Sequence, residues 1–389
     1  MDALSFIPYS RQHIDDDDVA TVVGALRADF VTQGPAVPAF EQAFAGVHRV
    51  AHAVAVSNAT AGLHLACLAL GVGPGQRVWT SPNSFVASAN CALYCGATVD
   101  FVDIDPRTRN LSIDALRIKL VAAESAGTLP SVVIPVDFAG LPVDFAELRA
   151  LADRYRFAVL EDASHATGAS YRGAPVASAY ADVTVFSFHA VKIVTTAEGG
   201  MVTTRDAALA ARLRALRSHG ITRDADELER PSEGPWYYEQ QRLGFNCRMT
   251  ELQAALGSSQ LRRLDAMHAR RTALADRYDR LLSALPLLLP ARADDRVSSW
   301  HLYSVEIDDA RTDATRAGVF AALREAQIGV NVHYLPIHTQ PYYERLGFRR
   351  RDFPHAERYA ARCLSLPLYP MLRDDEQDRV VACLRTVLA

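Results

Sequence analysis

Two hydrophobic periods alternate along the first 220 residues of the chain. Short apolar runs rich in β-branched residues, typical of buried strands, are followed by segments whose apolar residues recur every three or four positions, as in helices. Strands are predicted at residues 53–56, 77–80, 97–102, 132–136, 158–160, 183–186 and 201–204, and helices at 38–47, 63–70, 84–94, 116–123, 145–155 and 206–217. This alternation favours an α/β fold with a mostly parallel sheet flanked by helices.

The two ends of the chain predict further elements. The acidic run Asp15–Asp18 precedes apolar residues at helical spacing, and acids in a first turn favour the helix dipole, so we expect a helix start rather than a metal site. Residues 250–282 predict one long helix that bridges two domains, and the segments after it predict a smaller α+β domain. We therefore expect a large domain at 1–250, and the bridging helix with a small C-terminal domain at 251–389.

A long polar segment precedes the predicted bridging helix. Residues 223–240 are mostly polar and end close to Pro235-Trp236-Tyr237-Tyr238. Long connections without regular structure are uncommon in compact domains unless they are functional. The segment is therefore predicted to be an active-site loop rather than disorder.

Composition narrows the class of protein. Of the 389 residues, 49% are hydrophobic and 22% are charged, which is ordinary for a globular protein. The net charge of −4 offers no basic field for nucleic acid or an anionic membrane, and we expect neither a signal peptide nor a membrane-spanning helix. The cysteines are scattered in apolar context, as buried thiols of a reducing compartment are, so we expect a cytoplasmic protein. Cys91 and Cys95 lie one helical turn apart and are predicted to pack in the core, because no neighbouring residues complete a metal site.

One lysine lies at the centre of the strongest motif. A predicted strand ends at Ser187, Lys192 follows, and Gly199-Gly200 leads into the next apolar run. This order predicts a strand, a turn and a second strand, with Lys192 at the mouth of the turn. An amine among apolar neighbours is costly to keep charged, so its pKa should be depressed and its nitrogen made nucleophilic, as a Schiff-base lysine requires. The alternative is a surface lysine whose stem lies along apolar neighbours.

Other candidate residues also lie where predicted strands end. Ser57-Asn58-Ala59-Thr60 opens a helix, where free backbone N–H groups can bind phosphate, although a plain helix cap would give the same sequence. Phe85 and Asp162 follow two further strands. Because ligands of parallel sheets bind at the carboxyl ends of the strands, we expect these residues and Lys192 to share one site.

Asp162 allows two interpretations. A carboxylate at a strand exit, followed by Ala163-Ser164-His165, can cap a helix. It can equally pair with the protonated ring nitrogen of a pyridine cofactor and increase the power of that ring to withdraw electrons. The residues alone favour neither interpretation over the other.

Taken together, these motifs resemble those of the DegT-type sugar-nucleotide aminotransferases. The resemblance covers nearly the whole chain and implies the type I aminotransferase fold, with pyridoxal 5′-phosphate as cofactor. Cys247 departs from the family pattern, in which an aromatic residue is common at this position. The stretches that carry the resemblance are Ser57-Asn58-Ala59-Thr60, Glu161-Asp162-Ala163-Ser164-His165, Ser187-Phe188-His189-Ala190-Val191-Lys192, Glu198-Gly199-Gly200, residues 244–255, His333-Tyr334-Leu335-Pro336 and residues 366–370.

The resemblance implies roles for individual residues. Lys192 would bind the cofactor as a Schiff base and later move a proton between cofactor and substrate, and Asp162 would hold the pyridinium N–H. Phe85 would stack on the ring, and His165 would lie by the ring face or its phenolic oxygen. The other implied cofactor-binding residues are Ala59, Thr60, Ser187 and, from the neighbouring subunit, Asn246, and the implied substrate-binding residues are Arg248 and His333.

Residues 7–12, 29–35 and 218–221 resemble most the pseudaminic-acid branch of the family. That branch aminates C4 of a UDP-linked 4-keto-6-deoxy-N-acetylhexosamine, so we expect this sugar and L-glutamate as substrates. The resemblance also implies a homodimer with shared active sites. A transaminase for another nucleotide-linked keto sugar is the alternative within the family. The competing class is a non-catalytic regulatory relative that binds the cofactor, against which the presence of Lys192 argues.

Overall fold

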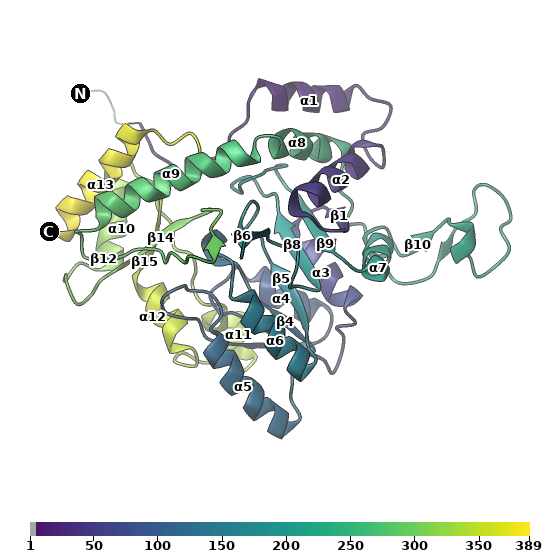
Figure 1. The fold of residues 1–389 in the computed structure, drawn as a ribbon, viewed down its shortest axis with the longest axis horizontal. Coiled ribbons are helices and arrows are strands. Elements are labelled where there is room, and N and C mark those ends of the chain that lie inside the picture. The colour runs from purple at the N-terminus through teal and green to yellow at the C-terminus, as the bar shows by residue number, and fades with distance from the viewer. Residues whose placement is uncertain (1–4) are drawn as a thin grey trace.

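The computed structural model describes residues 5–389, and its main element is a seven-stranded sheet (Figure 1). In spatial order the strands are β1 (His52–Val56), β9 (Gly200–Thr204), β8 (Val183–Ser187), β5 (Ala158–Asp162), β4 (Val132–Ile134), β2 (Arg77–Thr80) and β3 (Thr98–Phe101). The pairs from β8 to β3 are parallel, whereas β9 runs antiparallel to both β8 and β1. The predicted α/β fold with a mostly parallel sheet is confirmed.

Helices connect and cover these strands. They are α1 (Asp16–Leu26), α2 (Ala36–His48), α3 (Ala59–Ala69), α4 (Ala87–Tyr94), α5 (Ile113–Ala126), α6 (Phe145–Tyr155), α7 (Ala207–Arg217) and α8 (Glu251–Leu261). The Asp15 side chain accepts a hydrogen bond from the Asp18 N–H, and the Asp18 side chain accepts one from the Asp15 N–H, which confirms the predicted helix start. In the described range, every helix is too short or too polar to cross a membrane.

Two helices differ from the sequence prediction. The Asn58 side chain accepts a hydrogen bond of 2.8 Å from the Ala61 N–H, so α3 begins at Ala59 rather than at residue 63. The single helix predicted over 250–282 is wrong, because the chain breaks at residues 262–263 into α8 and α9 (Leu264–Leu282). Apolar residues at helical spacing continue on both sides of the break, and neither glycine nor proline marks it.

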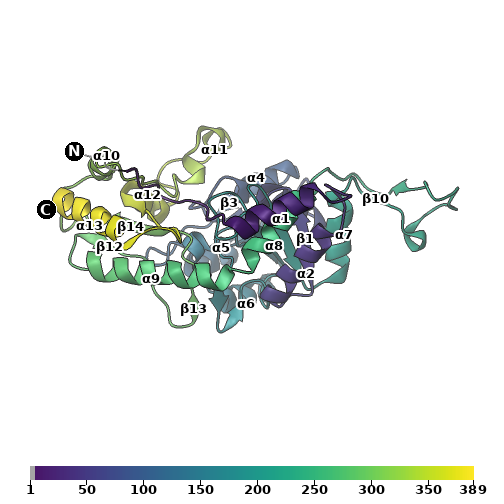
Figure 2. The ribbon, with the colours of Figure 1, turned by 90° about the horizontal axis from the view of Figure 1, so that it is seen from above.

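A second, smaller domain is built on a three-stranded antiparallel sheet (Figures 1 and 2). Its strands are β12 (Leu287–Leu288), β14 (Tyr303–Ile307) and β15 (Cys363–Leu366), and its helices are α10 (Arg316–Glu325), α11 (Pro341–Arg345), α12 (Pro354–Arg362) and α13 (Asp374–Leu388). A separate small sheet joins β13 (Arg296–Val297), β6 (Ser170–Tyr171) and β7 (Ala174–Pro175). Ile7 is fully buried in the small-domain core and pairs with Ile328, so the segment around Ile7 packs as part of the smaller domain.

The bridging role falls to α9. Leu264 and Met267, near its start, belong to the apolar cluster that includes β8 and β9, whereas Leu274 and Tyr278 belong to the small-domain core. Helix α8 contributes Ala254 to the first of these clusters. Helix α9 therefore contributes side chains to both packed cores.

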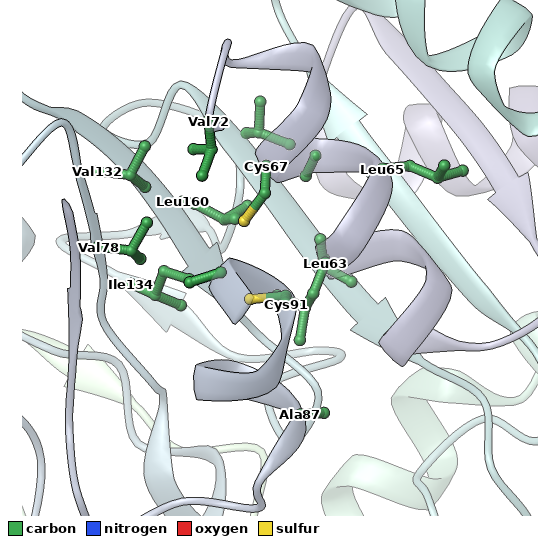
Figure 3. Close-up of a cluster of buried hydrophobic side chains, with 14 of the residues drawn as sticks. Leu63, Leu65, Cys67, Val72, Val78, Ala87, Cys91, Val132, Ile134 and Leu160 are labelled. Atoms are coloured by element: carbon green, nitrogen blue, oxygen red, sulfur yellow. The ribbon is translucent and has the colours of Figure 1, made fainter. Parts of the chain in front are cut away.

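Another apolar cluster packs α3 and α4 against the sheet (Figure 3). Cys67 and Cys91 are fully buried in it, and Cys95 packs against it. All six cysteines are free thiols, and residues 5–389 contain no group of three or more His, Cys, Asp or Glu side chains arranged to hold a metal ion. The predicted core role of Cys91 and Cys95 is confirmed.

Residues 219–243 form an arm that extends away from both domains (Figures 1 and 2). The short strands β10 (Ile221–Thr222) and β11 (Glu239–Gln240) pair at its base. The arm carries three exposed apolar side chains, with Trp236 at 71%, Tyr238 at 51% and Leu243 at 79% exposure. Such side chains on a projecting segment are typical of a contact with another molecule.

Candidate active site

A cavity of about 790 Å³ lies at the ends of β5 and β8 and receives residues from both domains. Its volume is in the range of small-molecule sites. The structure brings together eight of the ten residues that the sequence nominates. These are Ala59, Thr60, Phe85, Asp162, His165, Ser187, Lys192 and His333.

Lys192 lies in the connection between β8 and β9. Main-chain hydrogen bonds close this connection, from the Phe188 N–H to the Gly199 carbonyl at 2.9 Å and from the Lys192 N–H to the His189 carbonyl at 2.8 Å. The predicted strand, turn and strand are thereby confirmed. Burial lowers the pKa of the Lys192 amine to about 8, and the nearby charge of Asp162 opposes this shift. The depressed pKa was also predicted, and it increases the neutral, nucleophilic fraction of the amine.

Asp162 ends β5 with its carboxylate held on both oxygens. Oδ2 accepts a hydrogen bond of 2.6 Å from the Ser88 hydroxyl, and Oδ1 accepts one of 3.1 Å from the Ser164 N–H. Ser84 in turn lies 2.7 Å from Ser88, oxygen to oxygen. The residues after Asp162 form turns rather than a helix, so the helix-cap interpretation is wrong. Its carboxylate is available to a positively charged group in the cavity.

The start of α3 offers the cavity an anion cradle. Asn58 satisfies the Ala61 N–H, which leaves the Ala59 and Thr60 N–H groups at the first turn of the helix. Such groups, with the helix dipole, favour an anion. Gly200 makes the close approach of β9 possible, because a Cβ atom there would lie 2.8 Å from the Ala59 nitrogen. Ser187 pairs with Gly200 across β8 and β9, so its side chain lies beside the same helix start.

His165 is buried on the wall of the cavity, between the two domains. Its Nε2 atom lies 3.1 Å from the Tyr334 hydroxyl, and its ring centroid lies 4.4 Å from that of His301. Burial, reinforced by the charge of Lys192, lowers the pKa values of both histidines well below the ordinary range. Tyr334 and His301 were not singled out from the sequence as site residues. Tyr334 lies within the His333–Pro336 stretch that resembles the family, whereas His301 lies in none of the stretches that carry the resemblance.

His333 contributes an uncharged ring to the wall. Its Nδ1 atom lies 2.8 Å from the Ser365 hydroxyl, and its Nε2 atom lies 3.4 Å from the Asn331 amide nitrogen. Burial, with a smaller effect of Lys192, lowers the pKa of His333 to about 4. Both ring nitrogens therefore have hydrogen-bond partners within the small domain, and the ring is neutral near pH 7. The ring of Tyr9, from the N-terminal segment, lies 5.7 Å from it.

Phe85 is the exposed aromatic residue of the cavity. Its side chain is 59% exposed, and its ring centroid lies 6.5 Å from that of Tyr334. An exposed phenylalanine that lines a cavity offers a face on which a planar ring can stack. The position therefore suits the predicted stacking role.

Asn246 and Arg248 lie outside this cavity. The described residues that line the cavity wall do not include Asn246 or Arg248. Asn246 pairs with Ser218, and the adjoining Cys247 carbonyl accepts a hydrogen bond of 2.8 Å from the Ser57 N–H. Both residues thus lie at the base of the arm, on a segment that also borders the start of α3.

Two further carboxyl groups are buried behind Asp162. Asp137 is fully buried and Glu161 is 2% exposed. Burial raises the pKa of Glu161 to about 7, and burial together with the charge of Glu161 raises that of Asp137 well above its ordinary range. The Asp137 side chain accepts from the Val143 N–H at 3.0 Å, and the Thr184 hydroxyl donates to Glu161 at 2.7 Å. The effect of Glu161 on the pKa of Asp137 indicates that the two carboxyl groups lie close together.

Comparison with known proteins places this site in a family. The DegT/DnrJ/EryC1/StrS aminotransferase family model matches residues 12–385. The chain is 41% identical over 386 residues to the spore coat polysaccharide biosynthesis protein SpsC of Bacillus subtilis, a match that covers 98% of this chain and 97% of SpsC.

Solved structures agree with this placement. Spr1654 from Streptococcus pneumoniae, in its PLP form, superposes with a TM-score of 0.89 and 30% identity over 98% of each chain. Helicobacter pylori PseC, an aminotransferase involved in the biosynthesis of pseudaminic acid, superposes with a TM-score of 0.88 and 29% identity over 99% of each chain. The chain therefore belongs to the DegT/DnrJ/EryC1/StrS family of sugar aminotransferases, pyridoxal-phosphate enzymes with the type I aminotransferase fold.

Proposed function

We propose that the enzyme transfers the amino group of L-glutamate to C4 of a UDP-linked 4-keto-6-deoxy-N-acetylhexosamine. The observation that carries the transaminase chemistry is Lys192, with its depressed pKa, in one cavity with Asp162. The resemblance of residues 7–12, 29–35 and 218–221 to the pseudaminic-acid branch supports the choice of sugar, as does the similarity to PseC. Amino-sugar biosynthesis of the pseudaminic-acid type is the pathway we propose.

The residues of the cavity fit pyridoxal 5′-phosphate. The helix start at Ala59 and Thr60, with Ser187, suits the phosphate, and the close packing at Gly200 keeps that cradle small. Asp162 suits the protonated ring nitrogen, Phe85 the ring face and Lys192 the aldehyde carbon. When bound, the cofactor withdraws electrons from the carbon that carries the amino group.

The protein residues then direct the proton transfer. Lys192 would take the proton from the amino donor's carbon as a neutral amine and, as an ammonium group, would deliver it to the cofactor, a role that its pKa of about 8 allows. Asp162, held by Ser88 and the Ser164 N–H, would keep the proton on the ring nitrogen. His165, on the cavity wall, would lie beside the ring, and His333 would contact the substrate with a neutral ring face.

We propose that the working unit is a homodimer with shared active sites. Asn246 would complete the phosphate cradle of the partner subunit, and Arg248 would bind a substrate carboxylate or a nucleotide phosphate there. The position of both residues at the base of a projecting arm supports this arrangement, because the exposed Trp236 and Leu243 of the arm suit burial against a second copy. The free thiols suit a reducing compartment, and we propose the cytoplasm as its location.

A panel of nucleotide-linked keto sugars tests the substrate assignment. The purified enzyme, loaded with cofactor, is first treated with L-glutamate, and the loss of visible absorption and the release of 2-oxoglutarate are measured. Excess glutamate is removed and each sugar is added in turn. We expect the visible band to return fastest with the UDP-linked 4-keto-6-deoxy-N-acetylhexosamine. Faster return with a dTDP- or GDP-linked sugar would favour another transaminase of the family, and no response to any amino donor would favour a regulatory protein.

A further inference from the structure

Tyr334 reaches the cavity from the small domain and touches a side chain of the large domain. Its hydroxyl oxygen lies 3.1 Å from His165 Nε2, and its N–H donates a bond of 3.3 Å to the Asn83 side chain. Tyr334 lines the cavity, and its ring lies near Phe85. The hydroxyl is therefore held at a fixed point of the wall.

The hydrogen bonds of His165 determine which of its ring nitrogens carries the proton. The Ala139 N–H donates to His165 Nδ1 at 3.2 Å, and a backbone N–H can only donate. Nδ1 is therefore an acceptor without a proton. Burial holds the ring neutral, because it lowers the pKa of His165 well below the ordinary range. A neutral imidazole carries one proton, so that proton is on Nε2 and is donated to the Tyr334 oxygen.

The surroundings prevent His165 from turning. The Ser299 hydroxyl donates a bond of 2.6 Å to the His165 carbonyl, and the His301 ring packs against the His165 ring. Gly140 leaves no spare room, since a Cβ atom there would lie 2.2 Å from the Ser299 hydroxyl oxygen and 2.9 Å from the His165 carbonyl oxygen. The direction of the bond from Nε2 to Tyr334 is therefore fixed by packing.

In its bond with His165, the Tyr334 oxygen is consequently the acceptor, so the hydroxyl proton of Tyr334 is not donated to His165. Burial raises the pKa of Tyr334 above its ordinary value, and the negative charge of Asp162 adds to this effect, so the hydroxyl keeps its proton. Because Tyr334 lines the cavity, this proton is left for an acceptor within the cavity.

We propose that Tyr334 donates a hydrogen bond to an anionic oxygen of the ligand in this cavity, and that His165 is the positioning residue that directs it. The anionic oxygen is either the phenolic oxygen of the bound cofactor or a carboxylate of the amino donor. A short charge-assisted bond of this kind is stronger than a neutral one. The inference rests on the cofactor class of the family and is independent of which sugar the enzyme uses.

The test uses the Tyr334→Phe variant of the cofactor-loaded enzyme. If the acceptor is the cofactor, its phenolic oxygen becomes more basic without the donor and holds a neighbouring proton more tightly. The midpoint of the pH titration of the visible band then rises by about one to two units, which corresponds to the loss of one hydrogen bond to a charged group. If the acceptor is the amino donor, the titration is unchanged and the KM for glutamate rises about tenfold.

Tyr343→Phe is the matched control. The Tyr343 hydroxyl is bonded to Asn90 at 2.6 Å, and neither residue lines this cavity in the described chain, so the same chemical change should move neither readout. If Tyr334→Phe matches the wild type in both the titration and the KM, the proposal is wrong.

Two His165 variants test the positioning role. Glutamine places an amide N–H near the position of Nε2. The titration midpoint or the KM of His165→Gln should therefore lie closer to the wild-type value than that of His165→Leu. If His165 acts through Tyr334, His165→Leu should add little to the effect of Tyr334→Phe in the double variant. Additive effects would show that His165 acts on the ligand directly and would overturn this part of the proposal. Circular dichroism identifies any variant that fails to fold. If a His165 variant fails to fold, the Tyr334→Phe variant still tests the proposed hydrogen bond to the ligand.

Discussion

The Ser88 hydroxyl donates a hydrogen bond of 2.6 Å to the Asp162 carboxylate and so joins the first turn of α4 to the end of β5. Ser88 is fully buried, and its oxygen lies 2.7 Å from the Ser84 hydroxyl. Because a buried carboxylate with fixed donors keeps one orientation, the negative charge of Asp162 is directed into the cavity before any ligand arrives.

Replacing Lys192 with alanine should abolish transamination while the fold survives. The variant lacks the only amine in the cavity wall of the described chain that can hold the cofactor and carry the proton. The chain contains only two lysines, Lys119 and Lys192. Borohydride reduction of the loaded wild-type enzyme, followed by peptide mass spectrometry, should therefore place the cofactor on Lys192.

Lys119→Arg is the control for this experiment. The Lys119 amine is bonded to the Phe101 carbonyl at 2.7 Å and paired with Asp100 at 2.6 Å, away from the cavity. This variant should keep the visible band and the activity. Turnover by folded Lys192→Ala, or cofactor found on Lys119, would contradict the assignment.

Replacing Asp162 with asparagine should lower the rate by orders of magnitude and leave cofactor bound. An amide accepts the bond from Ser88 but cannot stabilise a protonated ring nitrogen as a carboxylate can. Single-turnover reaction with glutamate, followed in the visible spectrum, measures the loss directly. Ser88→Ala, which keeps the charge and removes one donor, should have a smaller effect. A near wild-type rate for Asp162→Asn would rule out the pyridinium role.

Mixing two inactive variants should restore activity if the sites are shared. One partner carries Lys192→Ala, and the other carries Asn246→Ala with Arg248→Ala. In a hybrid dimer, one of the two sites has every native residue. After refolding an equal mixture, we expect about a quarter of the wild-type activity, since about half of the dimers are hybrids and each has one intact site. Hybrid dimers that form, shown by mass spectrometry, and remain inactive would rule out the shared site.

Glu161→Gln should flatten the dependence of stability on pH. Glu161 has a pKa of about 7 in the folded chain against an ordinary value of 4.5, so between these values the folded state binds a proton that the unfolded state has lost. Stability contributed by this proton is full below about pH 4.5 and is lost as the pH rises toward 7. Urea unfolding at several pH values measures the slope, with the exposed Glu147→Gln as control. Equal slopes in wild type and Glu161→Gln would contradict the raised pKa.

The sequence predicts well those parts of the site whose residues directly follow a predicted strand. Asp162 and Lys192 each follow a strongly apolar strand, and parallel strands bring their carboxyl ends to one edge, so their meeting follows from the pattern alone. Tyr334 and Ser88 could not be found in this way. The role of Tyr334 depends on a contact between two domains, and the role of Ser88 depends on the rotation of α4 about its axis. The spacing of hydrophobic residues predicts neither of these features.

The break between α8 and α9 and the direction of the arm escaped prediction for related reasons. Residues 262–263 are good helix formers, so the break arises from how α8 packs on α1 and α2 and not from local preference. The polar composition of residues 223–240 predicted a loop, but composition carries no information on where a loop points. The arm extends away from both domains of its own chain, so a role as an active-site loop would require a second subunit.

The pairing of Ile7 with Ile328 has a consequence for synthesis on the ribosome. Tyr9, two residues after Ile7, lines the cavity, and its carbonyl accepts a bond of 3.0 Å from the Leu368 N–H. These partners are more than three hundred residues apart, so at about 5–20 residues per second the first segment emerges roughly 15–70 s before its partners exist. The large sheet can assemble during that interval, while Ile7 and Tyr9 find their places only after residues 328 and 368 have been made.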